Sequence, residues 1–332
     1  MPTLSSPRRV IPALLLIILA AAPSLAQSRD SRPSTPPSKT RDESPSKRSG
    51  PKIDLRPRLK PGQVIKFKMA MSNSGKQVVA TPTTPGTLTP TTAPTETTQN
   101  MSQEIGLTLK VKETNKETGS TLDLIYDSFK ISMKGPDGED ITFDSNGKNS
   151  DDPMSGLLAP LVGLTLELKM DKDGNITSVS TGGAGEAGDI AGLLGGASGM
   201  KSLTSADVVK NLFGPIMTTR KGAGEAHVGE SWTNEDLIDA PWGKMKLSTT
   251  QTLSSARGSV ATIDMKGKFD LQPSSGTSPA PSIRDSLYIG KTLWNTELGM
   301  LDEMTMTQRL VVEPSQGSKS TNEMNVKVTR LK

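Results

Sequence analysis

Cysteine is absent from this chain of 332 residues, and histidine occurs once, as His227. Without cysteine, the chain has no disulfide, no cysteine nucleophile, no iron–sulfur ligation and no lipid-modified cysteine. A single histidine cannot form a His/Cys metal cluster, and serine nucleophiles commonly depend on a histidine placed beside them. The sequence therefore predicts no metal site and no cofactor, and it offers no catalytic residue that can be named. We expect His227 to lie in an exposed loop, because no G-x-S-x-G motif accompanies it.

Aromatic residues and excess charge are also scarce. Phe, Trp and Tyr together number ten, so the chain has few platforms for stacking sugars. The net charge is +4, but residues 1–52 hold nine of the 39 basic residues and three of the 35 acidic residues. The remaining chain then carries 30 basic and 32 acidic residues, a net of −2. We therefore expect no nucleic-acid binding by the folded part and confine any such role to the basic tail.

The first 26 residues are typical of a secretory signal peptide. Arg8 and Arg9 supply the positive start, an apolar run extends from Val10 to Ala22, and Ser24-Leu25-Ala26 is a small-x-small cleavage site. We expect cleavage between Ala26 and Gln27. The apolar run is shorter than the roughly 20 residues of a spanning helix. The sequence predicts export, either periplasmic or secreted, and no transmembrane segment in the mature chain.

Composition divides the mature chain into four regions. Residues 27–52 are mainly Ser, Pro, Arg and Lys, which predicts a disordered linker because so little apolar surface can be buried. A first β unit is expected over 53–181, a glycine-rich and helical connector over 182–222, and a second β unit over 223–332. Within the first unit, residues 81–100 contain ten Thr and four Pro, which predicts a flexible loop.

Strict alternation of apolar and polar side chains dominates both β units. It is clearest in five runs: Ile65–Met71, Leu107–Val111, Leu164–Met170, Met304–Met306 and Met324–Val328. Strands with one polar face indicate antiparallel sheet. We predict a mainly β protein with curved antiparallel sheets, half-barrel or sandwich-like. The phase slips near Tyr126 and resumes at Phe129, which predicts a bulge.

Turns and two short helices complete the expected elements. Turn-forming residues stand at 135–138, 146–147 and 172–175. Helices are expected at about 153–162, capped by Asp151 or Asp152, and at about 205–217. In the second helix Ala206, Val209, Leu212 and Phe213 share one face.

A weak internal repeat suggests that the two β units are related. Pro61-Gly62-Gln63-Val64 enters the first unit, and Val228-Gly229-Glu230-Ser231 enters the second. Each unit later contains a Gly-x-Thr-Leu strand, at Gly163–Leu166 and Gly290–Leu293, followed by a glycine turn. Duplication explains this order, although chance similarity among strand sequences remains the alternative.

Three motifs resemble ligand sites, and for each the plainer interpretation is favoured. Residues 183–188 match G-x-G-x-x-G, but a flexible linker is expected because eight glycines fall within 182–199 and the preceding strand is half polar. Residues 171–175 resemble the start of a calcium loop, yet Gly182 occupies the position of the bidentate Glu, so we expect a turn. The acids between Asp137 and Asp152 are interpreted as solvated loop charge.

The 15 methionines are the compositional feature with the clearest functional implication. Methionine is an adaptable side chain of irregular cores and of promiscuous apolar surfaces. One hypothesis is an exported, non-enzymatic protein of the cell envelope or the secreted fraction that binds an apolar ligand or lipid in a Met/Leu-lined curved sheet. The alternatives are a carboxylate-based hydrolase and a structural or interaction module with no small-molecule ligand.

The order of features resembles a family of uncharacterised exported bacterial proteins that share a β-rich domain of unknown function. The residues that carry the resemblance are Leu59–Gln63, Leu158–Gly163 before a Leu-Glu-Leu strand, Asp173-Gly174, Val228–Trp232 and Gly290–Leu293. It covers about 55–330. The family implies no activity, catalytic residue, cofactor or partner.

Overall fold

The computed structural model describes residues 52–79, 95–134, 138–147, 155–181, 206–219, 224–240, 243–273, 282–313 and 319–332. The expected signal peptide with its Ala26/Gln27 cleavage site, nearly all of the 27–52 linker and the G-x-G-x-x-G motif at 183–188 lie outside these residues. The described chain is mainly β, as predicted. No helix within it is long and apolar enough to cross a bilayer.

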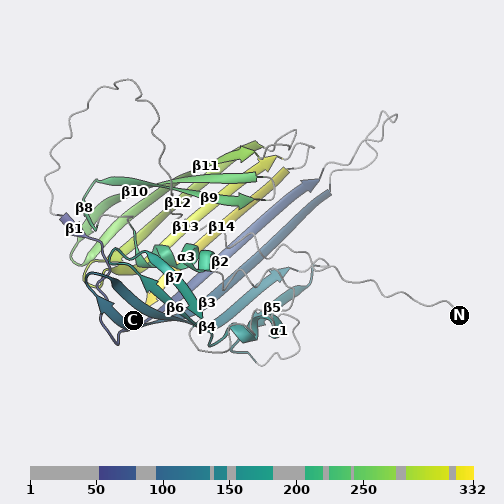
Figure 1. The fold of residues 1–332 in the computed structure, drawn as a ribbon. Coiled ribbons are helices and arrows are strands. Elements are labelled where there is room, and N and C mark those ends of the chain that lie inside the picture. The colour runs from purple at the N-terminus through teal and green to yellow at the C-terminus, as the bar shows by residue number, and fades with distance from the viewer. Residues whose placement is uncertain are drawn as a thin grey trace, which may run out of the picture.

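Fourteen strands are present among the described residues. They are β1 (Lys52–Asp54), β2 (Val64–Val79), β3 (Thr95–Asn115), β4 (Gly119–Lys134), β5 (Asp140–Asp144), β6 (Thr165–Met170), β7 (Ile176–Thr181), β8 (Glu225–His227), β9 (Ser231–Ala240), β10 (Gly243–Arg257), β11 (Val260–Pro273), β12 (Ser282–Asn295), β13 (Met300–Glu313) and β14 (Lys319–Leu331). All but β1 and β8 belong to one antiparallel sheet, in the order β7-β6-β4-β3-β2-β14-β13-β12-β11-β10-β9, with β5 paired to β4. The path is open, so β7 and β9 are its edges. The chain therefore forms one large curved sheet and not a sandwich of two (Figure 1).

The alternation predicted from the sequence decides which side chains are buried. In β2, Phe67, Met69 and Met71 are buried, while the alternate residues Lys66, Lys68 and Ser72 are exposed. The same pattern recurs in β14, where Met324, Val326 and Val328 are buried. We call the face with the buried side chains the inner face. The other face is polar and carries cross-strand ion pairs such as Lys68–Glu104 and Lys327–Glu303.

The phase slip near Tyr126 is a β-bulge, as predicted. Gly106 pairs with Ser128 and the next residue, Leu107, pairs with Tyr126, so Asp127 is the extra residue of β4. The Asp127 carboxylate accepts a hydrogen bond of 2.6 Å from the Thr108 hydroxyl. The bulge lets Tyr126 and Phe129 lie on the same face, where their rings stack with centroids 5.3 Å apart.

Helix α3 (Ala206–Met217) corresponds to the helix expected at 205–217. Its residues Val209 and Phe213 are buried, and the Phe213 ring meets the edge of Tyr126 at 6.2 Å. Beyond the helix, the Thr219 carbonyl accepts a hydrogen bond of 2.7 Å from Trp232 Nε1 in edge strand β9. Because α3 also packs against the other edge strand, β7, it lies between the two edges of the open sheet (Figure 1).

The helix expected at 153–162 is shorter in the structure. It consists of α1 (Ser155–Leu158) followed by a 3-10 turn, η2 (Ala159–Leu161). Its proposed caps, Asp151 and Asp152, lie outside the described residues. Leu158 and Leu161 are buried, so the segment contributes to the core.

Two local expectations differ from the structure. The loop predicted over 81–100 ends earlier, because Thr95–Asn100 belong to β3 and pair with Val79–Ser74 of β2. Residues 96–100 are polar and exposed, so backbone pairing to a long neighbouring strand extends β3 there without burial of side chains. His227 is half-buried and not exposed, since it ends β8 and pairs with Lys52 of β1.

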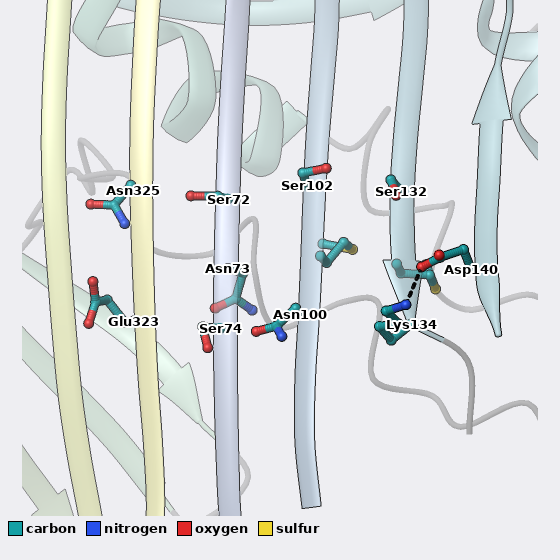
Figure 2. Close-up of a pocket in the computed structure, with 12 residues that line it drawn as sticks. Ser72, Asn73, Ser74, Asn100, Ser102, Ser132, Lys134, Asp140, Glu323 and Asn325 are labelled. Atoms are coloured by element: carbon teal, nitrogen blue, oxygen red, sulfur yellow. Dashed lines mark ion pairs between the residues drawn. The ribbon is translucent and has the colours of Figure 1, made fainter. Parts of the chain in front are cut away.

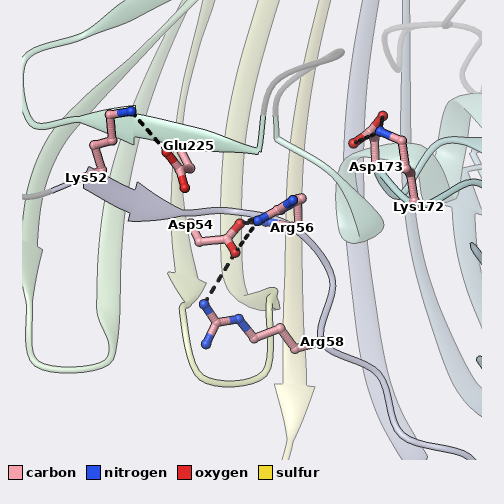
Figure 3. Close-up of polar contacts among 7 residues, drawn as sticks. All are labelled: Lys52, Asp54, Arg56, Arg58, Lys172, Asp173 and Glu225. Atoms are coloured by element: carbon pink, nitrogen blue, oxygen red, sulfur yellow. Dashed lines mark hydrogen bonds and ion pairs between the residues drawn. The ribbon is translucent and has the colours of Figure 1, made fainter. Parts of the chain in front are cut away.

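Residues 52–60, which we call the N-terminal strap, run across one end of the sheet. The Leu55 amide donates to the Gly224 carbonyl at 2.5 Å, and the Arg58 amide donates to the Leu298 carbonyl at 3.0 Å. Asp54 binds both Arg56 and Arg58, and Lys52 pairs with Glu225 (Figure 3). Partial burial alone raises the pKa of Asp54, but the hydrogen bonds and positive charge of Arg56, aided by Arg58, outweigh it and lower the pKa.

The loops that enter β2 and β9 make the same hydrogen bonds. The Gly62 amide donates to Val111 in β3, and the Gly229 amide donates to Leu253 in β10, at 2.8 and 2.7 Å. In each loop the next side chain reaches back three residues: Gln63 Oε1 accepts from the Lys60 amide, and Glu230 Oε2 accepts from the His227 amide. A register shift follows Val111 in β3 and follows Leu253 in β10.

Candidate functional site

Eight of the 15 methionines lie on three neighbouring rows of the inner face, which we call the methionine belt. A row is a set of residues paired across successive strands. Met304 and Met69 belong to the first row, Met265, Met306 and Met71 to the second, and Met324, Met101 and Met133 to the third. The rows are adjacent because successive inner-face residues of a strand are two apart.

Pairing between distant segments assembles this belt. Met71 of β2 faces Val326 of β14, and Val326 in turn faces Met306 of β13. Side chains at such paired positions lie about 5 Å apart. The methionines of the N-terminal and C-terminal parts therefore form one continuous surface across the β2–β14 junction.

Two glycines of the inner face allow close packing within the belt. A Cβ at Gly290 would lie 2.6 Å from the Met265 Cε, and a Cβ at Gly267 would lie 2.8 Å from the Tyr288 ring. The Met265 and Tyr288 side chains therefore lie directly on the backbone of the neighbouring strand. Burial, with a smaller contribution from the negative charge of Asp236, raises the pKa of Tyr288, which keeps its hydroxyl protonated.

Amide and hydroxyl side chains interrupt the belt, and all of them except Asn73 are at buried positions. Gln103 and Gln251 stand in the second row, and Thr249, Gln308 and Asn73 stand in the third. Gln251 is engaged, since its Oε1 accepts a hydrogen bond of 2.8 Å from Trp232 Nε1. In contrast, Thr249 Oγ1, Gln308 Oε1 and Asn73 Oδ1 are buried and have no hydrogen-bond partner within the described part of the chain.

Shallow depressions of about 560 and 350 Å³ lie over strands β2, β3, β4 and β14. Figure 2 shows the smaller one, where Ser72, Ser102, Ser132 and Asn325 form a polar surface beside the Lys134–Asp140 ion pair. These short side chains belong to the polar face, where they leave room between longer charged neighbours. A ligand pocket is typically concave and mostly apolar, so these depressions do not resemble one.

The acidic motifs form local contacts within turns and between strands. Asp171, which opens the proposed calcium loop, accepts hydrogen bonds from the Asp173 amide and from the amide and side chain of Asn175. Its carboxylate therefore holds the β6–β7 turn, as the turn interpretation predicted. From the acids between 137 and 152, Asp140 pairs with Lys134 and Asp144 with Lys130. Among the described residues, no group of three metal-ligating side chains converges.

A family model matches residues 117–317, more than half of the chain. The chain belongs to DUF6263, a family of unknown function. The matched region begins in the turn before β4 and ends beyond β13, so it includes four of the eight belt methionines, Met133, Met265, Met304 and Met306. Comparison with curated proteins yields no match.

Sequence reasoning found the methionines but missed the polar members of the belt. The sequence does indicate that Gln308 faces inward, because it lies between Met306 and Leu310 in the series of alternate residues that are otherwise apolar. A polar residue in that phase is expected to be buried, and buried polar groups usually have hydrogen-bond partners. The absence of a partner for Gln308 Oε1 could not be read from the sequence, because it depends on which side chains face it.

Proposed function

We propose that this protein is exported and acts, without catalysis, as a binding protein of the cell envelope or the secreted fraction, with an apolar ligand or lipid on its methionine belt. The concentration of eight methionines on three adjacent inner-face rows is the observation that carries this proposal. Thioether side chains have flexible torsions and polarisable sulfur, so they repack around ligands of varied shape.

The position of α3 supports the same function. Val209 and Phe213 of the helix are buried, and the Phe213 ring contacts Tyr126, which lies next to the first belt row on the inner face. The helix therefore packs beside the end of that row, which Phe129 occupies, and adaptable side chains line the belt beyond it. Export is supported by the Arg8–Ala26 pattern of the sequence.

The distribution of acids disfavours the hydrolase alternative. Such an enzyme needs two carboxyl groups about 5 to 10 Å apart that face one cleft. Among the described residues, Asp236 is the one buried acid, and many others, including Glu104, Asp144 and Glu303, form ion pairs on the polar face. A structural or interaction module remains the alternative and is expected to bind no small apolar molecule.

Titration with N-phenyl-1-naphthylamine, a neutral apolar fluorophore, tests this proposal on the chain that starts at Gln27. We expect a saturable rise in fluorescence. In the same titration the ε-methyl resonances of ¹³C-labelled methionines at the belt should shift by ring currents. Met170, Met217 and Met300 are buried outside the belt rows and serve as internal controls whose resonances should stay in place. Linear, non-saturable fluorescence, or equal shifts at belt and control methionines, would contradict the proposal.

We also propose that the two β units are related by duplication. The matching hydrogen bonds of the Gly62 and Gly229 loops and the matching register shifts after Val111 and Leu253 support it. In this correspondence β2, β3, β4, β6 and β7 align with β9 to β13. The turns Asp171–Gly174 and Asn295–Gly299 then coincide, and both end in a glycine of positive φ. Alignment of family sequences by these turns tests the relation, and absence of the entry glycine from either unit would oppose it.

A further inference from the structure

The third row of the methionine belt carries three buried oxygens that have no hydrogen-bond partner among the residues that the structure describes. They are Thr249 Oγ1, Gln308 Oε1 and Asn73 Oδ1. Thr249 is 1% exposed and Gln308 is 7% exposed, so bulk solvent cannot satisfy these groups. A buried polar atom without a partner costs about 1 to 3 kcal/mol in general, so such a row is unfavourable unless something binds to it.

The three oxygens share one line across the sheet. Along the third row, Thr249 pairs with Gly267, Gly267 with Tyr288, and Tyr288 with Gln308. Met324 then separates Gln308 from Asn73. At about 4.8 Å per strand, Gln308 lies about 14 Å from Thr249 and about 10 Å from Asn73 along the sheet. These spacings exceed the reach of a small head group, so one head group can satisfy only one of these positions.

The chemistry of the row specifies the class of ligand. Carboxamide oxygens accept hydrogen bonds and cannot donate them, and a threonine hydroxyl does both. The missing partner is therefore a donor. The three rows contain no Lys or Arg among their described residues, and Arg330, further along β14, is paired with Asp302 at 2.6 Å. An anionic head group would find no positive charge there.

We propose that the ligand is a neutral amphiphile whose hydroxyl-bearing head group donates a hydrogen bond to Gln308 Oε1 while its chain lies on the belt methionines. This inference rests on the proposed function, because it assigns the polar end of a ligand to the same surface. It excludes fatty acids and phospholipids with exposed phosphate as preferred ligands.

Competition with bound N-phenyl-1-naphthylamine tests the head-group preference with three probes of equal chain length. 1-Monolauroylglycerol is neutral with two hydroxyls, methyl laurate is neutral without a donor, and laurate is anionic. We expect monolauroylglycerol to displace the fluorophore at a concentration about 10-fold lower than either of the others, the effect of about one buried hydrogen bond. Equal displacement by all three overturns this inference and leaves the proposed function intact. Preferential displacement by laurate also overturns it. Failure of the fluorophore itself to bind counts against the proposed function.

Variants of the row provide the second test. Gln308→Leu should reduce the preference for monolauroylglycerol to less than about 3-fold without weakening methyl laurate. Thr249→Val, about 14 Å away along the row, should leave the preference in place. The matched controls are Gln77→Leu and Thr250→Val, because both residues are exposed and Thr250 is the neighbour of Thr249 on the polar face. Without ligand, Gln308→Leu should raise the melting temperature by about 2 °C or more, because an unpaired buried amide is removed. A fall in melting temperature, with the preference retained, would show that Gln308 serves packing alone.

Discussion

Single residues with unusual backbone conformation hold the N-terminal strap against the sheet. Gly299 has φ +61° and Gly174 has φ +87°, a region that side chains with a Cβ rarely adopt. A Cβ at Gly299 would lie 2.0 Å from the Arg56 carbonyl oxygen, and one at Gly174 would lie 2.7 Å from the Pro57 ring. The strap therefore fits only because both turns present a glycine to it.

Gly299→Ala is expected to lower the free energy of unfolding by more than about 2 kcal/mol, through the left-handed backbone and the clash with the strap. Urea denaturation followed by circular dichroism measures the change. The matched control is Gly258→Ala, which has a similar φ of +57° but nothing within 4 Å of the added Cβ. It should cost only about 1 kcal/mol. Equal losses of unfolding free energy in the two variants would show that contact with the strap does not restrict residue 299.

Asp54 makes part of the stability dependent on pH. Its pKa is lowered in the folded state, so its ionised form stabilises the protein above the unfolded-state pKa of about 4, and this contribution is lost as pH falls through the folded pKa. Asp54→Asn should therefore be less stable than wild type at pH 7, and the difference should shrink below pH 4. Unfolding by urea at pH 7, 5 and 3 measures it. A difference that is constant down to pH 3 would contradict this account.

Helix α3 is the element that spans the opening of the sheet. It packs against β7 at one edge, and Thr219 just beyond it accepts a hydrogen bond from Trp232 of β9 at the other edge. Pro215 lies inside the helix and removes one backbone donor. The helix is therefore held mainly by the side chains it buries, such as Phe213 and Ile216.

Phe213→Ala is expected to lower the free energy of unfolding by about 3 kcal/mol, because it leaves a cavity next to Tyr126. Leu237→Ala is the surface control, since Leu237 is 52% exposed and should change stability by less than about 0.5 kcal/mol. Thermal and urea unfolding measure both. If the two variants lost similar stability, α3 would not be packed on the inner face as described.

Across the whole molecule, the strands of 53–181 and those of 223–332 share one sheet. The junction is the pairing of β14 with β2, the last and first long strands, which extends from Lys319↔Val78 to Leu331↔Lys66. One continuous inner face results, with Val328 of β14 opposite Met69 of β2 at its centre. Cooperativity between the two units is the expected consequence.

Val328→Asp is therefore expected to destabilise both units together, by more than about 3 kcal/mol, because it buries an unpaired charge at the junction. Hydrogen exchange should show loss of protection in β4 and in β11 alike. Thr329→Asp, at the neighbouring position of the polar face, should leave protection nearly unchanged. Loss confined to the second unit would show that the units unfold separately.

Which side chains face inward follows from the amino-acid sequence alone. Alternation in Ile65–Met71 and Met324–Val328 is a local property of strands, and it correctly assigned the inner face, as the phase slip near Tyr126 correctly located the bulge. Local pattern misjudged Thr95–Asn100, whose strand conformation comes from a partner strand and not from their own composition. His227 was misjudged for the same reason, through its pairing with Lys52.

Only the tertiary structure decided which inward-facing residues meet. Met71, Val326 and Met306 lie far apart in the chain, and only the registers of β2, β14 and β13 bring them into one row. The same registers place Thr249, Gln308 and Asn73 on a single line without partners. Alternation has a period of two residues within a strand and contains no information about the neighbour across it. The candidate site therefore arises from long-range pairing of strands.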